Sequence, residues 1–398
     1  MIRKKKKHEN YLPNLKASDP QVMELWVRAG GRCEFHGCND YLLQDKLTTT
    51  KAILADVAHI VARSKSGPRG DDSMLLIQRN EIENLFLACT KHHRMIDKKS
   101  LVTRYPKELL LKYKEDHEER TKYLTGLGDE NETTVIRMIG NVRGNSVSIS
   151  NEEIRVAALK SSGRYPRYLG AENHIEIDLT SLPDNDLIQY WKLGAEKIQD
   201  SIKRMVTPVI ERGEIRHLSL FAFARIPFLA YLGHSIGDKI PLDIFQKHRS
   251  DREGWIWSSQ EKDQKFKFKK IQVGRNNKSI AIIVSISGKV PIEHLPPLIS
   301  KDFTIYSLVP VGSKPSRNLM SSKGTLNQFR HTYARLLREI EGNYPFAKII
   351  HVLPALPISG ALILGRELLR DVSPSLVIYD KSQKGFEEAI KINTNEKG

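Results

Sequence analysis

The stretch Asn84-Leu-Phe-Leu-Ala-Cys-Thr-Lys-His-His-Arg-Met-Ile-Asp97 carries two metal-binding patterns one after the other. Cys89 and His92 have the Cys-x2-His spacing of a zinc ligand pair. If this segment is helical, His93 and Asp97 lie four residues apart on one face and can share a divalent cation. The stretch therefore predicts a zinc-supported element that also carries a second metal site.

The other two cysteines of the chain form a second pair upstream, Cys33 and Cys38. Structural zinc is usually bound by two such short-spaced pairs. An odd number of cysteines, without a secretory signal, argues against a disulfide framework. Structural zinc is the interpretation that uses every cysteine. Buried free cysteines are the alternative, and His36, inside the first pair, is a competing ligand.

Length and charge describe the chain as a whole. A chain of 398 residues predicts two or three domains. The net charge of +16 indicates attraction to a polyanion such as nucleic acid. The basic run at residues 3–7 is either a phosphate-binding arm or a solvated tail, and no apolar signal region follows it. Because the chain also lacks a long apolar run, we expect a cytoplasmic protein that does not contact membranes.

Between the cysteine pairs lies a candidate general base, His59, near the end of a strand-like run at 53–60. It would face the cation of His93 and Asp97 and take a proton from a water molecule aimed at phosphorus. An unperturbed imidazole is largely neutral near pH 7. A single histidine in Ala-His-Ile is more often structural, but its place in this ordered set favours catalysis. In the loop that follows, the basic residues either hold flanking phosphates or are merely solvated: Arg63, Lys65 and Arg69.

This set of residues resembles the HNH family of ββα-metal endonucleases, over about residues 30–100. The resemblance implies that His59 is the general base and that Asn84 holds the histidine-bearing loop in place. It also implies that His93 and Asp97 bind the catalytic Mg²⁺ or another divalent cation. The sequence departs from the family at Ala58, where many members carry a metal-ligating Asp or His. Asp56, two residues before Ala58 and so on the same strand face, is expected to compensate.

The rest of the chain repeats one pattern, a buried strand, a Pro-marked turn, a helix and a second strand, at 218–246 and at 349–380. Each copy predicts a βαβ unit. Apolar strands without alternation indicate parallel sheets that are covered on both faces. Two Rossmann-like halves are therefore expected. Their ligand crevice would lie beyond the carboxyl ends of the strands, at 224–227 and 355–359.

Two motifs in these repeats resemble the SAVED sensor domain: Phe221-Ala-Phe-Ala-Arg-Ile-Pro-Phe-Leu-Ala-Tyr-Leu-Gly233 and His351-Val-Leu-Pro-Ala-Leu-Pro357. SAVED domains consist of paired CARF-like halves that bind cyclic oligonucleotides. An HNH nuclease fused to SAVED resembles the effector nucleases of CBASS antiphage systems. The resemblance implies that a cyclic di- or trinucleotide from a CD-NTase binds the sensor. It also implies that the ligand drives a homo-oligomer, expected to be a dimer, into a larger assembly that degrades double-stranded DNA.

A cyclic nucleotide needs surfaces on which its bases stack and donors for its phosphates. The residues near the expected crevice that could supply them, although either tryptophan taken singly is more often a core residue, are Arg225, Pro227, Gln246, Arg249, Trp255, Trp257, Lys314, Arg317, Leu356 and Ser359.

The predicted fold is an α+β, zinc-supported ββα-metal nuclease domain followed by an α/β domain of two Rossmann-like, CARF-like halves. The nuclease domain is expected at 1–125, a linker and a connecting hairpin at 126–150, and the SAVED domain at 151–398. Two other functions stay open on the sequence. One is a modification-dependent restriction endonuclease, and the other is a zinc-stabilised, ligand-responsive DNA-binding regulator without catalysis.

Overall fold

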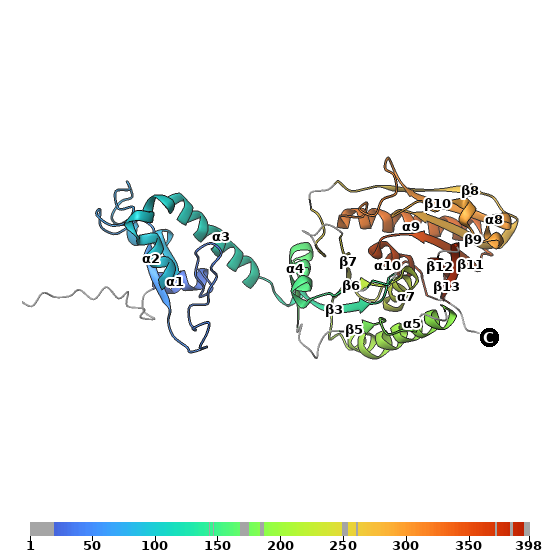
Figure 1. Ribbon diagram of the computed structural model, residues 1–398, viewed down its shortest axis with the longest axis horizontal. Helices are drawn as coiled ribbons and strands as arrows, with labels where there is room; N and C mark the ends of the chain where they lie inside the picture. The colour runs from blue at the N-terminus through green and yellow to red at the C-terminus, as the bar shows by residue number, and fades with distance from the viewer. Residues whose placement is uncertain are drawn as a thin grey trace, which may run out of the picture. The chain divides into compact units, whose positions relative to one another are not determined.

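The computed structural model describes residues 20–142, 144–145, 147–167, 175–183, 187–248, 254–259, 262–370, 372–382 and 385–393. The chain divides into two units, and the boundary lies between Gly128 and Asp129 (Figure 1). The basic run at 3–7 lies outside the described residues. No helix in the described part of the chain has the length and apolar composition needed to cross a membrane.

The first unit is built around an antiparallel strand pair in which His59 lies opposite Leu85. The second strand, Leu85–Cys89, is buried up to Ala88, so it forms part of the core of this unit. The helix that follows it buries Ile96 and leaves its other residues at the surface or half-buried, which suits a helix that carries a site. The elements of this unit are α1 (Pro20–Arg28), β1 (Ala55–His59), η1 (Gln78–Asn80), η2 (Ile82–Asn84), β2 (Leu85–Cys89), α2 (Thr90–Asp97), η3 (Lys99–Arg104) and α3 (Lys107–Thr125).

The second unit contains two sheets. In the first, β4 (Tyr165–Pro166), β3 (Glu132–Ile139), β6 (Leu218–Phe223) and β7 (Leu242–Phe245) follow in that order, and β5 (Ile175–Asp178) also pairs with β3; every pairing is parallel. In the second, the order is β13 (Gly385–Ile392), β12 (Ser375–Ser382), β11 (Ile349–Ala355), β9 (Asn276–Ser285), β10 (Phe303–Pro310) and β8 (Phe266–Gln272). Only the edge strands β8 and β13 run antiparallel to their neighbours.

The repeated βαβ pattern of the sequence is confirmed. In both copies the two strands pair directly and in parallel, β6 with β7 and β11 with β12. The crossover helices are α7 (Ile226–Ile236) and α10 (Ile358–Arg366). The remaining helices of this unit are η4 (Asp129–Asn131), α4 (Asn151–Ser162), α5 (Leu187–Ser201), the π-helical turn η5 (Ile202–Val206), α6 (Thr207–Glu211), η6 (Ile292–His294), α8 (Pro297–Asp302) and α9 (Lys323–Asn343).

The hairpin expected within 126–150 is wrong. Residues 132–139 form β3, a parallel strand of the first sheet that pairs with β6 along most of its length. Ile136 and Met138 are fully buried there. Gly140 and Gly144 suggested a turn, but a single isolated bridge, Val142 with Asn145, is the antiparallel pairing in this segment among the described residues. The second unit therefore begins at Asp129, inside the segment 126–150 in which the sequence predicted a linker and a hairpin.

Candidate functional site

The four predicted zinc ligands meet at one point of the first unit. The Nδ1 atom of His92 lies 3.1 Å from the Sγ of Cys89 and 3.7 Å from that of Cys33. Cys38 completes the group, whose ligand atoms all lie within 4.8 Å of one another. A tetrahedral zinc site with bonds of about 2.0–2.3 Å separates its ligand atoms by about 3.3–3.8 Å. The donor set and the spacing therefore fit zinc.

The surroundings of these ligands are apolar. Burial raises the pKa of the Cys33 thiol, and it lowers the pKa of His92, whose ring stacks on Phe35 at 4.1 Å. Thiols and a neutral imidazole in such a place are stable as neutral groups or as ligands of a cation that offsets the thiolate charge. His36, the competing ligand, lies outside the group and stacks instead on Tyr113.

The second expected metal site brings together residues from β1 and α2. Nε2 of His93 lies 3.2 Å from a carboxylate oxygen of Asp97, and Nδ1 lies 3.4 Å from one of Asp56. The hydrogen bond with Asp97 is the largest cause of the raised pKa of His93. Asp56 therefore lies beside the pair from α2, where the resemblance requires a substitute for the ligand missing at Ala58.

The two carboxylates approach His93 from opposite sides of its ring. Of the residues that the structure describes, only the cysteine–histidine group places three or more ligand atoms within 4.8 Å of one another. Asp56, His93 and Asp97 thus supply oxygen and nitrogen donors that suit Mg²⁺, Mn²⁺ or Ni²⁺. To converge on one ion, the His93 ring would have to turn one of its nitrogens away from a carboxylate.

His59 ends β1 and is half-buried beside this group. Burial is the largest cause of its lowered pKa, and the positive charge of Arg63 acts in the same direction, as does that of His93. Asp97 and a hydrogen bond with Asn80 oppose this shift. The imidazole is therefore neutral near pH 7, the form that a general base requires. Its Nε2 lies 3.3 Å from Oδ1 of Asn80.

Asn84 is buried and holds the backbone that follows His59. Its Oδ1 accepts a bond from the Val61 amide at 2.8 Å, and its Nδ2 donates to the Val61 carbonyl at 2.9 Å. The same Nδ2 donates to the carbonyl of Arg79 at 2.8 Å. Asn84 thus lies where a loop-holding residue is needed, and it does not reach the face that would meet a substrate.

Arg69 does not have the exposed position that a DNA contact needs, so that expectation is wrong. Its side chain is buried, donates to the carbonyls of Ile60, Ile96 and Tyr105, and lies 3.5 Å from Asp97. It joins the β1 end to α2. Arg63 and Lys65, by contrast, are exposed and stay candidates for phosphate contacts.

Sequence reasoning missed two residues of this site, Arg79 and Asn80. Arg79 is 2 % exposed and donates to carbonyls of the loop after His59, and Asn80 contacts the His59 imidazole directly. Neither residue belongs to a motif, and a charged residue in a polar segment usually indicates solvent. Only the burial of Arg79, which the sequence pattern does not reveal, identifies it.

In the second unit, the expected crevice residues gather at the carboxyl ends of the parallel strands. The segment after β6 carries Arg225, and the segment after β11 carries Leu356 and Ser359. The loop after β10 carries the exposed Lys314 and Arg317, and Ser316 in that loop bonds to Ile286, just beyond β9. The strand ends of the six-stranded sheet therefore lie at one edge.

Most of these residues are committed to the core, which corrects the expectation that they face a ligand. Trp255 and Trp257 are 1 % and 5 % exposed; Trp255 packs edge-on against Phe221, and the Trp257 indole donates to the Ile244 carbonyl at 3.0 Å. The apolar side chains near the crevice are closed to solvent as well. Pro227 and Leu356 are buried. Arg249 lies outside the described residues.

Polar members of the set join the two halves instead. Gln246, after β7, accepts from the Ser359 hydroxyl at 2.6 Å and donates to the Met320 carbonyl at 2.8 Å. Arg225 pairs with Asp380 of β12 and lies 4.5 Å above the Trp191 ring. Of the ten expected residues, Lys314 and Arg317 are therefore the described ones with freely exposed cationic side chains.

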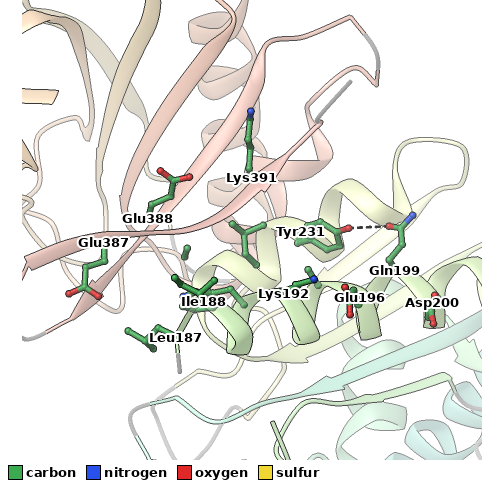
Figure 2. A pocket seen from close by; sticks show the side chains of 14 residues that line it. Leu187, Ile188, Lys192, Glu196, Gln199, Asp200, Tyr231, Glu387, Glu388 and Lys391 are labelled. Atoms are coloured by element: carbon green, nitrogen blue, oxygen red, sulfur yellow. Dashed lines mark hydrogen bonds between the residues drawn. The ribbon is translucent and has the colours of Figure 1, made fainter. Parts of the chain in front are cut away.

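A cavity of about 910 Å³ lies elsewhere, between α5, Tyr231 of α7 and β13 (Figure 2). None of the expected ligand residues lines it. Its charged side chains are Glu196, Asp200, Glu387, Glu388, Lys192 and Lys391. Carboxylates outnumber ammonium groups there, so this cavity disfavours an anionic ligand.

Comparison with known proteins bears on the second unit. Residues 198–392 match the family model described as "SMODS-associated and fused to various effectors sensor domain", SAVED. No curated protein matches the sequence.

Among solved structures, the chain is similar to the Cap4 SAVED/CARF-domain containing receptor of Acinetobacter baumannii with the cyclic trinucleotide 3'3'3'-cAAA, at 13 % identity and a TM-score of 0.45. That alignment covers 81 % of this chain and 64 % of the other. The Moraxella osloensis Cap4 receptor gives 14 % identity, 74 % and 60 % coverage and a TM-score of 0.36. The chain thus spans less than two thirds of these receptors. Its match to the SAVED sensor family lies in the second unit, over residues 198–392.

Proposed function

We propose that this protein is a metal-dependent endonuclease that cleaves double-stranded DNA when a cyclic oligonucleotide binds its second unit, as an effector of CBASS-type antiphage defence. One observation carries the nuclease part: β1, β2 and α2 bring the neutral His59 imidazole to the Asp56–His93–Asp97 group. The match to a sensor family described as fused to effectors supports the regulatory part.

The chemistry proposed for the first unit is phosphodiester hydrolysis. His59 takes the proton of the attacking water. Asn80 accepts from the Nε2–H of His59, because an amide oxygen can only accept, and this leaves Nδ1 as the basic atom. A divalent cation held by Asp56, His93 and Asp97 supplies charge stabilisation at phosphorus and at the leaving oxygen when bound. Arg63 and Lys65 hold the neighbouring phosphates.

Structural zinc, held by Cys33, Cys38, Cys89 and His92, has a different task in this proposal. It joins the segment before β1 to the start of α2, so that the chain cannot open between them. Since His93 directly follows a zinc ligand, zinc binding also fixes the position of the catalytic group. It takes no part in the chemistry.

We place the cyclic oligonucleotide at the carboxyl edge of the second unit, where Lys314 and Arg317 are exposed. Cationic side chains there favour the phosphates of the ligand, whereas the acidic lining of the cavity at α5 and β13 opposes them. Because Gln246, Ser359, Arg225 and Asp380 join the two halves at this edge, a ligand bound there can change how the halves meet. Assembly of homo-oligomers on ligand binding is the proposed consequence.

The experiment is plasmid cleavage with purified protein and Mg²⁺, with and without a panel of cyclic di- and trinucleotides. Cleavage that requires one cyclic nucleotide supports the proposal. Cleavage that depends only on base modification of the plasmid identifies a restriction enzyme. DNA binding without cleavage, across the panel and with Mn²⁺ or Ni²⁺ in place of Mg²⁺, identifies a regulator.

A further inference from the structure

We propose that Arg79 is a positioning residue for the general base, and that it acts on His59 by two routes, through the backbone of Ala62 and through the side chain of Asn80. The inference rests on the proposed nuclease function and extends it. Arg79 does not touch the reacting atoms. It holds the group that does.

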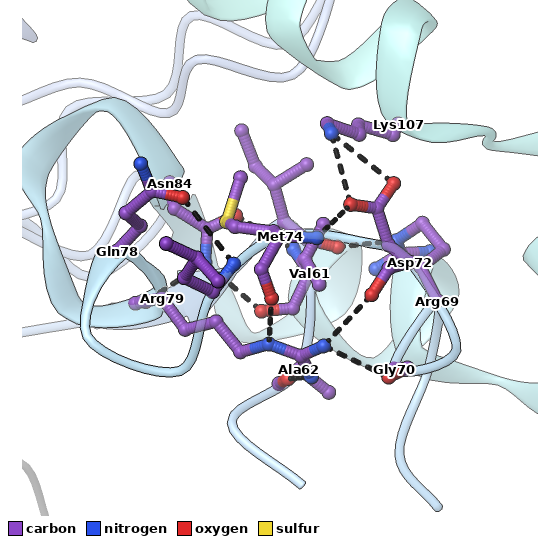
Figure 3. A network of polar contacts seen from close by, with 12 residues as sticks. Val61, Ala62, Arg69, Gly70, Asp72, Met74, Gln78, Arg79, Asn84 and Lys107 are labelled. Carbon is purple, nitrogen blue, oxygen red and sulfur yellow. Dashed lines mark hydrogen bonds and ion pairs between the residues drawn. The ribbon is translucent and has the colours of Figure 1, made fainter. Parts of the chain in front are cut away.

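The hydrogen bonds of Arg79 connect several parts of the loop that follows His59 (Figure 3). Its guanidinium donates to four backbone carbonyls, at 2.6–3.2 Å: those of Ala62, Gly70, Asp72 and Met74. One side chain therefore fixes residues spread over the whole of the 62–74 loop. Arginine suits this task because its planar fork offers five donors in a fixed geometry, which a lysine ammonium does not.

The burial of Arg79 argues that it has a purpose beyond stability. The side chain is 2 % exposed, and its four bonded acceptors are uncharged carbonyls. Removing a guanidinium from water is unfavourable, and neutral acceptors offset this only in part. Asp72, a carboxylate of the same loop, forms its ion pair at 3.0 Å with Lys107 instead. A hydrophobic residue would avoid this cost, but it would leave the four carbonyls without a donor and the loop without its fixed conformation.

The first route to His59 runs along the backbone. Each of the three residues after His59 has its carbonyl bonded to a buried side chain. Arg69 donates to Ile60, Asn84 donates to Val61, and Arg79 donates to Ala62. The bond from Asn84 to the Arg79 carbonyl links two of these three. Without Arg79, the last of the three anchors is lost and the half-buried carbonyl of Ala62 loses its donor.

The second route is through the next residue in the chain. Asn80 belongs to η1 with Arg79, so the position of the Arg79 backbone sets that of the Asn80 amide. The Oδ1 of Asn80 lies 3.3 Å from Nε2 of His59. Asn80 is exposed, and the backbone of η1, which it shares with Arg79, carries its side chain. Arg79 therefore determines both the position of the His59 backbone and the orientation of the His59 imidazole.

The test is a double-mutant cycle with Arg79→Lys and Asn80→Ala in the full chain, and Arg104→Lys as the matched control. Arg104 is an exposed arginine of the same unit. We expect each of the first two variants to lower kcat by about 10- to 100-fold with KM for DNA within about twofold, because a displaced base reduces the rate without weakening binding. The double variant should lose much less than the product of the two effects, since both act on one imidazole. The control should keep the wild-type kcat.

A second measurement does not depend on cleavage. In zinc-loaded protein without added Mg²⁺, hydrogen exchange in the segment 60–74 should be faster in Arg79→Lys than in wild type and unchanged in Arg104→Lys. Wild-type kcat in Arg79→Lys or in Asn80→Ala overturns the inference, and so do multiplicative effects in the double variant. If Arg79→Lys does not fold, the kcat of the exposed Asn80→Ala variant decides. A wild-type protein that never cleaves DNA refutes the proposed function. The exchange rates then still test whether Arg79 fixes the conformation of the 62–74 loop.

Discussion

Gly233 of α7 and Gly365 of α10 pack each against the backbone of the other's helix. A Cβ atom at Gly233 would lie 2.0 Å from the Leu362 carbonyl oxygen, and one at Gly365 would lie 1.8 Å from that of Ala230. Each glycine stands ten residues after the last residue of its strand, Phe223 or Ala355. The two βαβ repeats therefore meet through the same position, and a side chain at either would force the helices apart.

Alanine at Gly233 or Gly365 is expected to destabilise the second unit by about 1–3 kcal/mol or more, because the clash is with backbone that cannot rotate away. Gly342, near the end of α9, has no atom within 4 Å of its Cβ position and is the matched control. Gly342→Ala should leave stability unchanged or slightly raised. Urea unfolding measures all three. Equal stability of Gly233→Ala and Gly342→Ala would contradict this account of the helix crossing.

The sequence was informative where one residue type had one physical use. The Cys and His spacing predicted a group that the structure brings together, and the repeated strand–Pro–helix–strand pattern predicted both βαβ units. Which polar residues face solvent was not predictable. Arg69 and Gln246 are polar residues near a predicted site, as a ligand contact would be, but tertiary packing buries both. Trp255 and Trp257, expected as stacking surfaces, are core residues instead, packed against Phe221 and bonded to the Ile244 carbonyl.

Zinc is expected at one ion per chain and should depend on His92 rather than on His36. His92→Ala removes one of four ligands, so it should release the metal and unfold the first unit at a lower temperature. His36→Ala, a change of the same kind three residues after Cys33, should retain the full metal content. Metal analysis and thermal unfolding of both variants are the measurements. Loss of zinc from the His36 variant alone would reassign the fourth ligand.

Replacing His59 by alanine should lower kcat by about 10²–10⁴-fold, since proton transfer by a positioned base contributes about that much. The fold and the metal content should not change, because His59 is not a metal ligand in this proposal and its side-chain hydrogen bond, at 3.3 Å, is with the exposed Asn80. Plasmid nicking and circular dichroism check the two halves of the prediction. Full activity in a folded His59→Ala protein would remove His59 from the catalytic role.

The basic residues of the 62–74 loop should separate into two classes. Arg63→Ala and Lys65→Ala should each weaken DNA binding and lower the slope of log K against log salt by about 1, because each loses one phosphate contact. Arg69→Ala should keep that slope and lose about 1–3 kcal/mol of stability instead, because the carbonyls of Ile60, just after β1, and of Ile96 in α2 lose their buried donor. DNA binding at several salt concentrations distinguishes the classes. An Arg69 variant of wild-type stability with a reduced slope would restore Arg69 as a DNA contact.

Acid should destabilise the second unit through His217, which is 6 % exposed and lies 2.8 Å from the Thr133 hydroxyl and 3.5 Å from Asp243. Burial is the main cause that lowers its pKa to about 4, and the charges of Arg164 and Lys323 act in the same direction. In the unfolded chain the imidazole titrates near about 6.5. As the pH falls from about 6.5 to about 4, the unfolded chain therefore binds a proton that the folded one does not, and the free energy of unfolding decreases. The loss should amount to about 1–3 kcal/mol.

Urea unfolding of wild type and His217→Gln between pH 7 and pH 4 measures this loss. The variant should show a shallower decline, although His351, whose pKa is also lowered to about 4 by burial, keeps part of it. Identical slopes for the two proteins would mean that His217 titrates alike in the folded and unfolded states, which its burial argues against.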